Sequence, residues 1–215
     1  MIRLNLFILL LLSFGCIANS TSILVLAANA SPIENMVVYL TPQKAISINS
    51  INTKPLIINQ KNKQFVPYIE VIQKGKNISF HNNDDITHHI YSVSGKNRFD
   101  FKIQGNHVKE SPNLNSVGEV AMGCNIHDWM SGYVLVVDTP FFTKTNKQGR
   151  AIFANLPAGK YELTVWHPQL DVAKNKVTQN ITLPNSKKWQ IKLPKKLLPL
   201  PSQESDEDFD FLEGY

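Results

Sequence analysis

Apolar side chains recur along most of the chain in short runs that alternate with polar residues, the period of two expected of β-strands. Runs rich in valine, isoleucine and aromatic residues, bounded by glycine, proline or asparagine, are typical of strands in a β-sandwich. They occupy residues 36–40, 56–58, 65–72, 77–80, 90–93, 117–122, 133–137, 151–153, 161–166, 180–183 and 189–193. Residues 95–110 are basic and suggest a loop. The pattern predicts an all-β protein.

A turn at 138–140, Asp-Thr-Pro, divides this pattern in two. We expect a first β-domain over 31–138 and a smaller β-sandwich over 139–194. The smaller domain is short for an independent core, so we expect it to pack tightly on the first, with the strand at 36–40 as a candidate shared element. Residues 195–215 are basic, then proline-rich, then acidic, which predicts a disordered tail.

The N-terminus has the pattern of a secretory signal peptide. Arg3 supplies the positive charge, residues 6–12 an apolar segment, and Ala28-Asn-Ala30 a small-residue cleavage site. We therefore predict a signal peptide over 1–30 and a periplasmic mature protein. Lipid attachment at Cys16 and an uncleaved membrane anchor are the alternatives. No other stretch approaches the roughly 20 apolar residues of a membrane-spanning helix, so no span is expected in the mature chain otherwise.

Charge and cysteine content narrow the function classes. The net charge is +5 and the pI about 9.1, but the basic residues are scattered and no nucleic-acid motif accompanies them. We expect docking to proteins rather than nucleic-acid binding. Of the two cysteines, Cys16 lies in the leader, which leaves Cys124 unpaired. An unpaired thiol in an oxidising compartment is expected to be buried or to hold a metal.

The stretch from Val117 to Val137 concentrates the chemistry of the chain. Cys124, His127 and Met130 are each separated by two residues and lie between two strand-like runs. A thiolate, an imidazole and a thioether on one loop suit copper, and two histidines, a cysteine and a weak axial methionine form the blue-copper electron-transfer site. The second histidine would come from His88 or His89. Zinc is disfavoured because methionine is a poor zinc ligand and one thiolate is present.

Nucleophilic catalysis by Cys124 with His127 is the enzymatic alternative. The loop does not readily supply a third group to orient the histidine, and methionine has no use in such a site. We therefore expect no catalytic residues and no enzymatic activity.

The Cys-x-x-His-x-x-Met motif, with an upstream histidine before a strand, resembles the cupredoxin family, and its short spacing is similar to that of amicyanin. The wider run from Gln60 to Met130 resembles cupredoxin-like proteins labelled methylamine utilization protein. The pattern over 145–163 is similar to transthyretin-like modules of the carboxypeptidase regulatory type.

This resemblance implies a Greek-key cupredoxin sandwich followed by a transthyretin-like sandwich. It also implies one type 1 copper ion, bound by His88, Cys124, His127 and Met130, that exchanges single electrons with protein redox partners. His89 stands where the family usually has an asparagine that braces the ligand loops, so the choice between His88 and His89 stays open.

Two functions of other classes remain as alternatives: a copper-delivery protein, and a structural module with an idle metal site. Asn83 and Asn125 are candidates to orient the metal ligands. Trp129 and Ile126 are candidates to form an apolar docking surface. His127 is expected to have its outer edge near solvent. His81, His107 and His167 are expected to be structural or surface residues.

Overall fold

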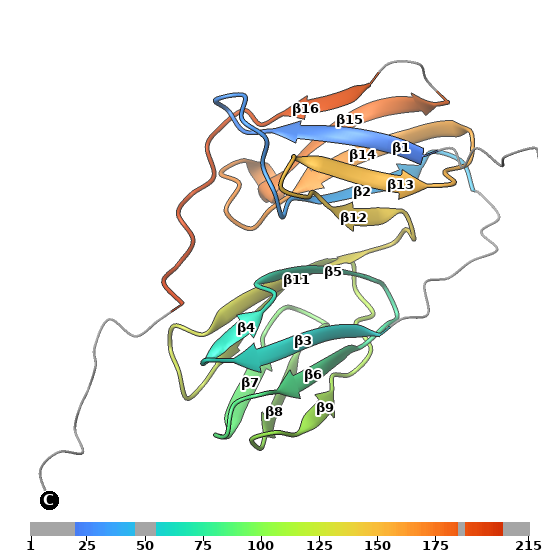
Figure 1. Cartoon of the computed structure of the whole chain (residues 1–215). Coiled ribbons are helices and arrows are strands. Elements are labelled where there is room, and N and C mark those ends of the chain that lie inside the picture. The colour runs from blue at the N-terminus through green and yellow to red at the C-terminus, as the bar shows by residue number, and fades with distance from the viewer. Residues whose placement is uncertain (1–19, 46–54, 185–187, 204–215) are drawn as a thin grey trace, which may run out of the picture.

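The structure, a computed structural model, describes residues 20–45, 55–184 and 188–203. Within these ranges sixteen strands form four sheets, and Ala173–Asn175 forms a short 3₁₀ turn. The strands are arranged in two lobes (Figure 1). The predicted all-β class is confirmed. In the described ranges no helix has the length and apolarity needed to cross a membrane.

The first lobe is a sandwich of a four-stranded and a five-stranded sheet. The four-stranded sheet has the order β4-β3-β6-β9 and the five-stranded sheet the order β5-β11-β10-β7-β8. Side chains such as Ile58, Phe80, Ile90 and Val134 pack between the two sheets and form the core. The strands are β3 (Leu56–Lys61), β4 (Gln64–Val66), β5 (Ile69–Gln73), β6 (Ile78–Asn82), β7 (His88–Ser92), β8 (Phe99–Ile103), β9 (Val108–Glu110), β10 (Gly118–Cys124) and β11 (Ser131–Val137).

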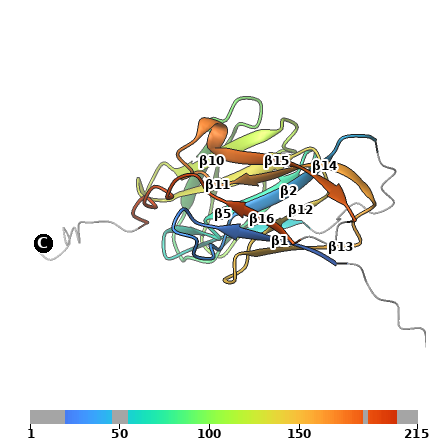
Figure 2. The same cartoon turned by 90° about the horizontal axis from the view of Figure 1, so that it is seen from above.

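The second lobe is also a sandwich, seen from above in Figure 2. Its sheets have the orders β13-β1-β16 and β12-β2-β14-β15. Ile23, Leu40, Phe153, Tyr161 and Leu163 belong to the core between them. The strands are β1 (Ser20–Leu26), β2 (Val37–Pro42), β12 (Phe142–Lys144), β13 (Arg150–Ala154), β14 (Gly159–Trp166), β15 (Lys176–Leu183) and β16 (Trp189–Lys192).

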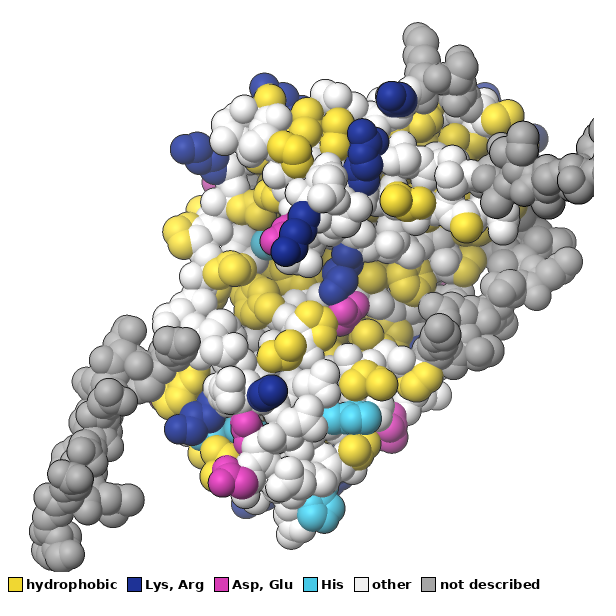
Figure 3. All heavy atoms as spheres, viewed as in Figure 1, with side chains coloured by type: hydrophobic (Ala, Val, Ile, Leu, Met, Phe, Trp, Pro, Cys, Tyr) yellow, Lys and Arg dark blue, Asp and Glu magenta, His cyan; other side chains and the backbone are white. Residues whose placement is uncertain are grey.

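The two lobes pack together through a third apolar cluster, which we call the interlobe cluster: Val37, Ile69, Val71, Leu135, Val137 and Trp166. These residues come from β2 and β14 of the second lobe and from β5 and β11 of the first. The end of β11, Val134 to Val137, is buried at four successive positions because alternate side chains enter the first lobe's core and the interlobe cluster. Strands covered on both faces have such continuous apolar runs. Apolar side chains are visible in the furrow between the lobes (Figure 3).

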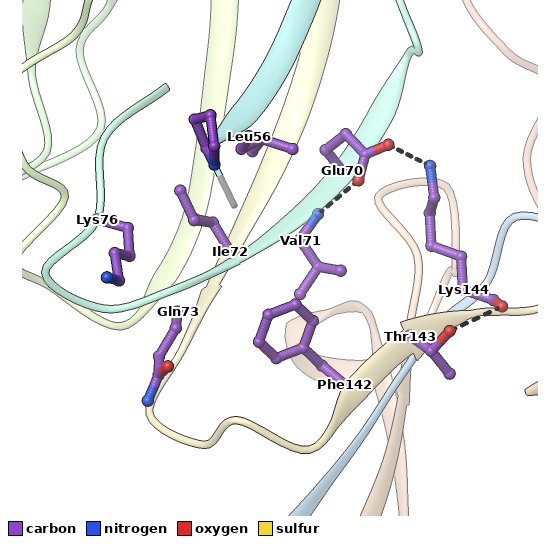
Figure 4. A pocket seen from close by; sticks show the side chains of 10 residues that line it. Leu56, Glu70, Val71, Ile72, Gln73, Lys76, Phe142, Thr143 and Lys144 are labelled. Carbon is purple, nitrogen blue, oxygen red and sulfur yellow. Dashed lines mark hydrogen bonds and ion pairs between the residues drawn. The ribbon is translucent and has the colours of Figure 1, made fainter. Parts of the chain in front are cut away.

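Polar contacts also cross this boundary. Lys144 on β12 forms an ion pair with Glu70 on β5, and its ammonium donates a hydrogen bond to the carbonyl oxygen of Ile69 at 2.9 Å. Figure 4 shows this pair at the side of a cavity of about 290 Å³, with Phe142 lying beside Val71. The expectation that the smaller sandwich packs on the first domain agrees with these contacts.

The strand pairing does not follow the predicted boundaries, which placed a signal peptide before residue 31 and the first domain after it. β2 lies within the predicted first domain and contains the strand expected as a shared element; it pairs with β12 and β14 of the second lobe. Residues 20–26, predicted to be removed with the signal peptide, form β1, and Ile23 and Val25 are fully buried in the second lobe's core. The remainder of the predicted signal peptide, 1–19, lies outside the described residues. The second lobe thus draws strands from both sides of the first in sequence.

Two expectations about irregular segments also need correction. Residues 95–110 contain β8 and β9, because Phe99 and Ile103 point into the core while Asp100 and Lys102 face solvent. The start of the predicted disordered tail is held in place: the Leu198 N–H donates to the Gln169 carbonyl oxygen at 2.9 Å, and the Gln203 amide donates to the Ser131 hydroxyl at 3.0 Å. Residues 204–215 of that tail lie outside the described residues.

Candidate metal centre

The Cys-x-x-His-x-x-Met segment joins β10 to β11 at one end of the first lobe. These strands pair antiparallel from Gly118↔Val136 to Gly123↔Ser131, so the loop between them is short. The Met130 N–H closes it by donating to the His127 carbonyl oxygen at 3.0 Å. β7 pairs with the end of β10 at Cys124↔Ile90, which brings the start of β7 beside the loop.

This pairing gathers His88, Cys124 and His127 into one buried cluster. The Cys124 sulfur lies 3.9 Å from Nδ1 of His88 and 3.8 Å from Nδ1 of His127. Typical bonds of about 2.3 Å from a metal to thiolate and 2.0 Å to imidazole place these donor atoms about 3.7 Å apart at a trigonal angle. The two sulfur-to-nitrogen distances therefore fit donors that share one ion.

The predicted ligands differ little in how far their side chains are exposed to solvent. The Met130 side chain is 1% exposed and belongs to the same core cluster as Cys124. His88 is 0% and His127 7% exposed, so His127 keeps the larger contact with solvent. Beside it, the Trp129 ring lies 5.4 Å from the imidazole centroid, and Ile126 is half exposed. The cluster is buried, and His127 is the more exposed of its two histidines.

Asp84, which sequence reasoning did not single out, orients His88. Its carboxylate accepts a hydrogen bond from Nε2 of His88 at 2.8 Å. Because a carboxylate only accepts, Nε2 carries a proton, and Nδ1, the nitrogen that faces Cys124, is left to bind a metal. The backbone N–H groups of Asn62 and Lys63 donate to the same carboxylate at 2.6 and 3.0 Å. The neighbouring Asp85 carries the same side chain, so composition alone could not distinguish the two.

The electrostatics of Asp84 and His88 agree with this pairing. Burial alone would raise the pKa of Asp84, but hydrogen bonds from Lys63, His88 and Asn62 lower it. Burial would likewise lower the pKa of His88, but its contacts with Cys124 and Asp84 raise it.

His89 is positioned differently from His88. Its Nε2 contacts the carboxylate of Asp100 on β8, and His89 is not among the clustered donors. Its carbonyl oxygen accepts from the Asn125 N–H at 2.9 Å, and its Nδ1 lies 3.4 Å from the Asn125 side-chain amide. His89 thereby links β7 to the loop of Cys124 and His127.

The Cys124 thiol is prepared for deprotonation. Burial raises its pKa, but hydrogen bonding to His88 and to backbone N–H groups of the loop outweighs burial and lowers the pKa to about 7. One of these groups, the Ile126 N–H, lies 3.5 Å from the sulfur. Burial, followed by the nearby charge of His88, lowers the pKa of His127. A thiolate beside a neutral imidazole is the state in which both bind metals.

The remaining candidates lie elsewhere. The Asn83 amide donates to Asn59 at 3.1 Å rather than to a ligand. His81 contacts the Ser79 hydroxyl, and His107 the Gly105 carbonyl oxygen. His167 is buried beside the interlobe cluster, where its Nδ1 accepts from the Gln169 N–H at 3.2 Å.

No protein-family model matches the chain, and no curated protein matches it. The solved structures that resemble it include a copper-containing nitrite reductase from Thermus scotoductus SA-01, at 18% identity and a TM-score of 0.38 over 54% of this chain. They also include a purple cupredoxin from Nitrosopumilus maritimus, at 20% identity and 0.34 over 38%. A third is amicyanin from Paracoccus versutus, at 15% identity and 0.36 over 46%. This chain covers 28% of the nitrite reductase, 99% of the purple cupredoxin and 98% of the amicyanin.

Proposed function

We propose that this protein is an exported, periplasmic type 1 copper protein that passes single electrons between protein partners. The observation that carries the proposal is the buried cluster in which two imidazole nitrogens face one cysteine sulfur at 3.8 and 3.9 Å. Cysteine, two histidines and a nearby methionine form the donor set of blue-copper centres. A bound copper ion would supply the one-electron couple; the protein supplies the geometry.

Each residue has a defined part in this function. His88, held by Asp84, and His127 would be the nitrogen donors and Cys124 the thiolate, and Met130, in the same core cluster as Cys124, would be a weak thioether donor. Because His88 and Cys124 lie on paired strands, the donors are held against rearrangement when the charge of the site changes. The surrounding core would limit the access of water, and His127, which is 7% exposed, would be the path for the electron.

The same cluster could serve copper delivery, a function of a different class. Reversible reduction of copper-loaded protein in the presence of a Cu(I) chelator separates the two. An electron carrier keeps its copper bound through repeated cycles with ascorbate and ferricyanide. Loss of copper to the chelator on the first reduction would contradict electron transfer and favour delivery.

A further inference from the structure

β1 is an integral strand of the second lobe. It lies between β13 and β16, pairing antiparallel with the first from Ser20↔Ala154 to Leu24↔Arg150 and parallel with the second from Ile23↔Trp189 to Leu26↔Lys192. Ile23 and Val25 are fully buried in the core. A chain that began at Ser31 would lack the central strand of this three-stranded sheet and leave β13 and β16 without their shared partner.

The small residues at 28–30, which suggested a cleavage site, are explained by the turn that they form. They lie in the turn that follows β1, where the Ala27 N–H donates to the Ser31 carbonyl oxygen at 2.8 Å and the Ala30 N–H donates to the Ala27 carbonyl oxygen at 2.9 Å. The Asn29 side chain accepts from the Ser31 N–H and hydroxyl. Ala30 itself has a positive φ of 67°. The apolar patch that precedes the turn is the buried face of β1.

A second small-residue site lies upstream of β1. Ala18 has Cys16 two residues before it, so small side chains occupy both positions that a signal peptidase reads. Arg3 and the apolar run that follows it supply the other two parts of a signal peptide. Cleavage at this site would leave the whole of β1 in the mature protein.

We propose that signal peptidase hydrolyses the Ala18–Asn19 bond, so that the mature protein begins one residue before β1. Water adds across the peptide bond, Ala18 leaves as the carboxyl end of the leader, and Asn19 becomes the free amino terminus. This proposal rests on the export assumed in the proposed function. Cys16 departs with the leader, and Cys124 is then the single thiol of the mature protein.

The test is the intact mass of the exported protein, expressed as the full chain with its own leader in a bacterial host that has a periplasm. We expect the mass of residues 19–215. A mass of 31–215, a lipid-modified chain beginning at Cys16, or the uncleaved chain would each overturn the proposal.

Matched variants locate the cleaved bond. Ala18→Asn should accumulate the uncleaved precursor, whereas Ala30→Asn should be processed like the parent. Asparagine suits both positions because it is not among the small residues of such sites and tolerates the left-handed conformation of Ala30. Normal processing of Ala18→Asn, or blocked processing of Ala30→Asn, would contradict the assignment.

The Cu(II) spectrum of the same samples keeps this inference separate from the proposed function. Protein whose mass matches residues 19–215 but whose spectrum lacks a copper–thiolate band would refute the copper site alone. Protein whose mass matches residues 31–215 and whose spectrum shows the band would refute the cleavage site alone.

Discussion

Asp84 links the loop before β7 to the candidate metal centre through a single hydrogen bond to His88. Carboxylates that orient a metal-binding histidine are typically worth about 10–100-fold in metal affinity. We predict that Asp84→Asn weakens Cu(II) binding by about this factor, because the amide no longer requires a proton on Nε2. Competition with a chelator of known affinity measures it. Asp85→Asn is the control, since Asp85 is exposed, and an equal loss in both variants would refute a specific role for Asp84.

His167 is a second residue whose environment predicts a measurable property. Burial lowers its pKa to about 4 from the ordinary histidine value of 6.5. The unfolded chain therefore binds a proton between these values that the folded chain does not, so stability falls as pH drops through this window. From pH 7 to pH 5 the loss due to this residue is about 2 kcal/mol.

Urea unfolding at the two pH values tests this, with His167→Asn as the non-titrating variant. Asparagine can still accept the hydrogen bond that the Gln169 N–H donates to His167. We expect this variant to lose about 2 kcal/mol less than the parent on acidification. His81→Asn, in the first lobe, is the control. Identical pH dependence in the parent and in His167→Asn would show that His167 is not the group responsible.

Three of the candidate donors, Cys124, His127 and Met130, could be singled out from the sequence because they lie within seven residues at regular spacing. His88 and His89 could not be separated by spacing; in the structure the pairing of β7 with β10 brings His88, and not His89, into the cluster with Cys124. Asp84 was not predictable from spacing. Its role depends on the backbone of Asn62 and Lys63, which are distant in sequence and hold its carboxylate in place.

At the scale of elements, the turn between β8 and β9 supports the loop that carries Asp84. A Cβ atom added to Gly105 would lie 2.5 Å from the backbone carbonyl group of Asp85, where no side chain can yield. We predict that Gly105→Ala lowers the free energy of unfolding by about 1–3 kcal/mol, as overpacking does. It should also weaken Cu(II) binding by displacing Asp84.

Chemical denaturation and chelator competition measure these two effects. Gly159→Ala is the matched control, because its added Cβ would meet only the Tyr161 ring at 3.7 Å. If Gly105→Ala bound copper as tightly as the parent, the proposed support of Asp84 by this turn would be wrong.

The elements were predictable where alternation was uninterrupted, as in β7, β10, β11 and β14. Residues 65–72 were predicted as one strand but form β4 and β5, because Pro67 has no N–H to continue the ladder. β8 was missed although Phe99, Phe101 and Ile103 alternate with charged residues. Its basic neighbourhood suggested a loop, while burial of one face was enough to form a strand.

At the scale of the whole molecule, the interlobe cluster joins two sandwiches whose strands are interleaved in sequence. Trp166 is its largest side chain and is buried. Truncation of a buried tryptophan to alanine costs about 3–5 kcal/mol. We predict a loss of this size in Trp166→Ala, with separation of the single unfolding transition into two as the lobes uncouple.

Calorimetry, together with copper absorbance as a probe of the first lobe, measures this coupling. Ile57→Ala, a change at an exposed position of β3 in the first lobe, should leave the transition single. Two transitions in the parent protein would contradict strong coupling of the two lobes through the interlobe cluster.

The overall arrangement was the least predictable level. Both sandwiches follow from short-range alternation, but the assignment of β1 and β2 to the second lobe depends on pairing with strands more than a hundred residues later. The apolar patch of β1 directly follows a segment that resembles a signal peptide, so composition could not show where the signal peptide ends and β1 begins. Burial of Ile23 and Val25 does separate them.

The visible and EPR spectra of protein loaded with Cu(II), compared with those of Cys124→Ser, test the central claim most directly. The proposed site predicts an intense visible band and narrow copper hyperfine splitting, both lost in the serine variant because the thiolate is the source of the band. A weak spectrum of ordinary tetragonal copper that is unchanged by the substitution would contradict the type 1 site, and with it the proposed electron transfer.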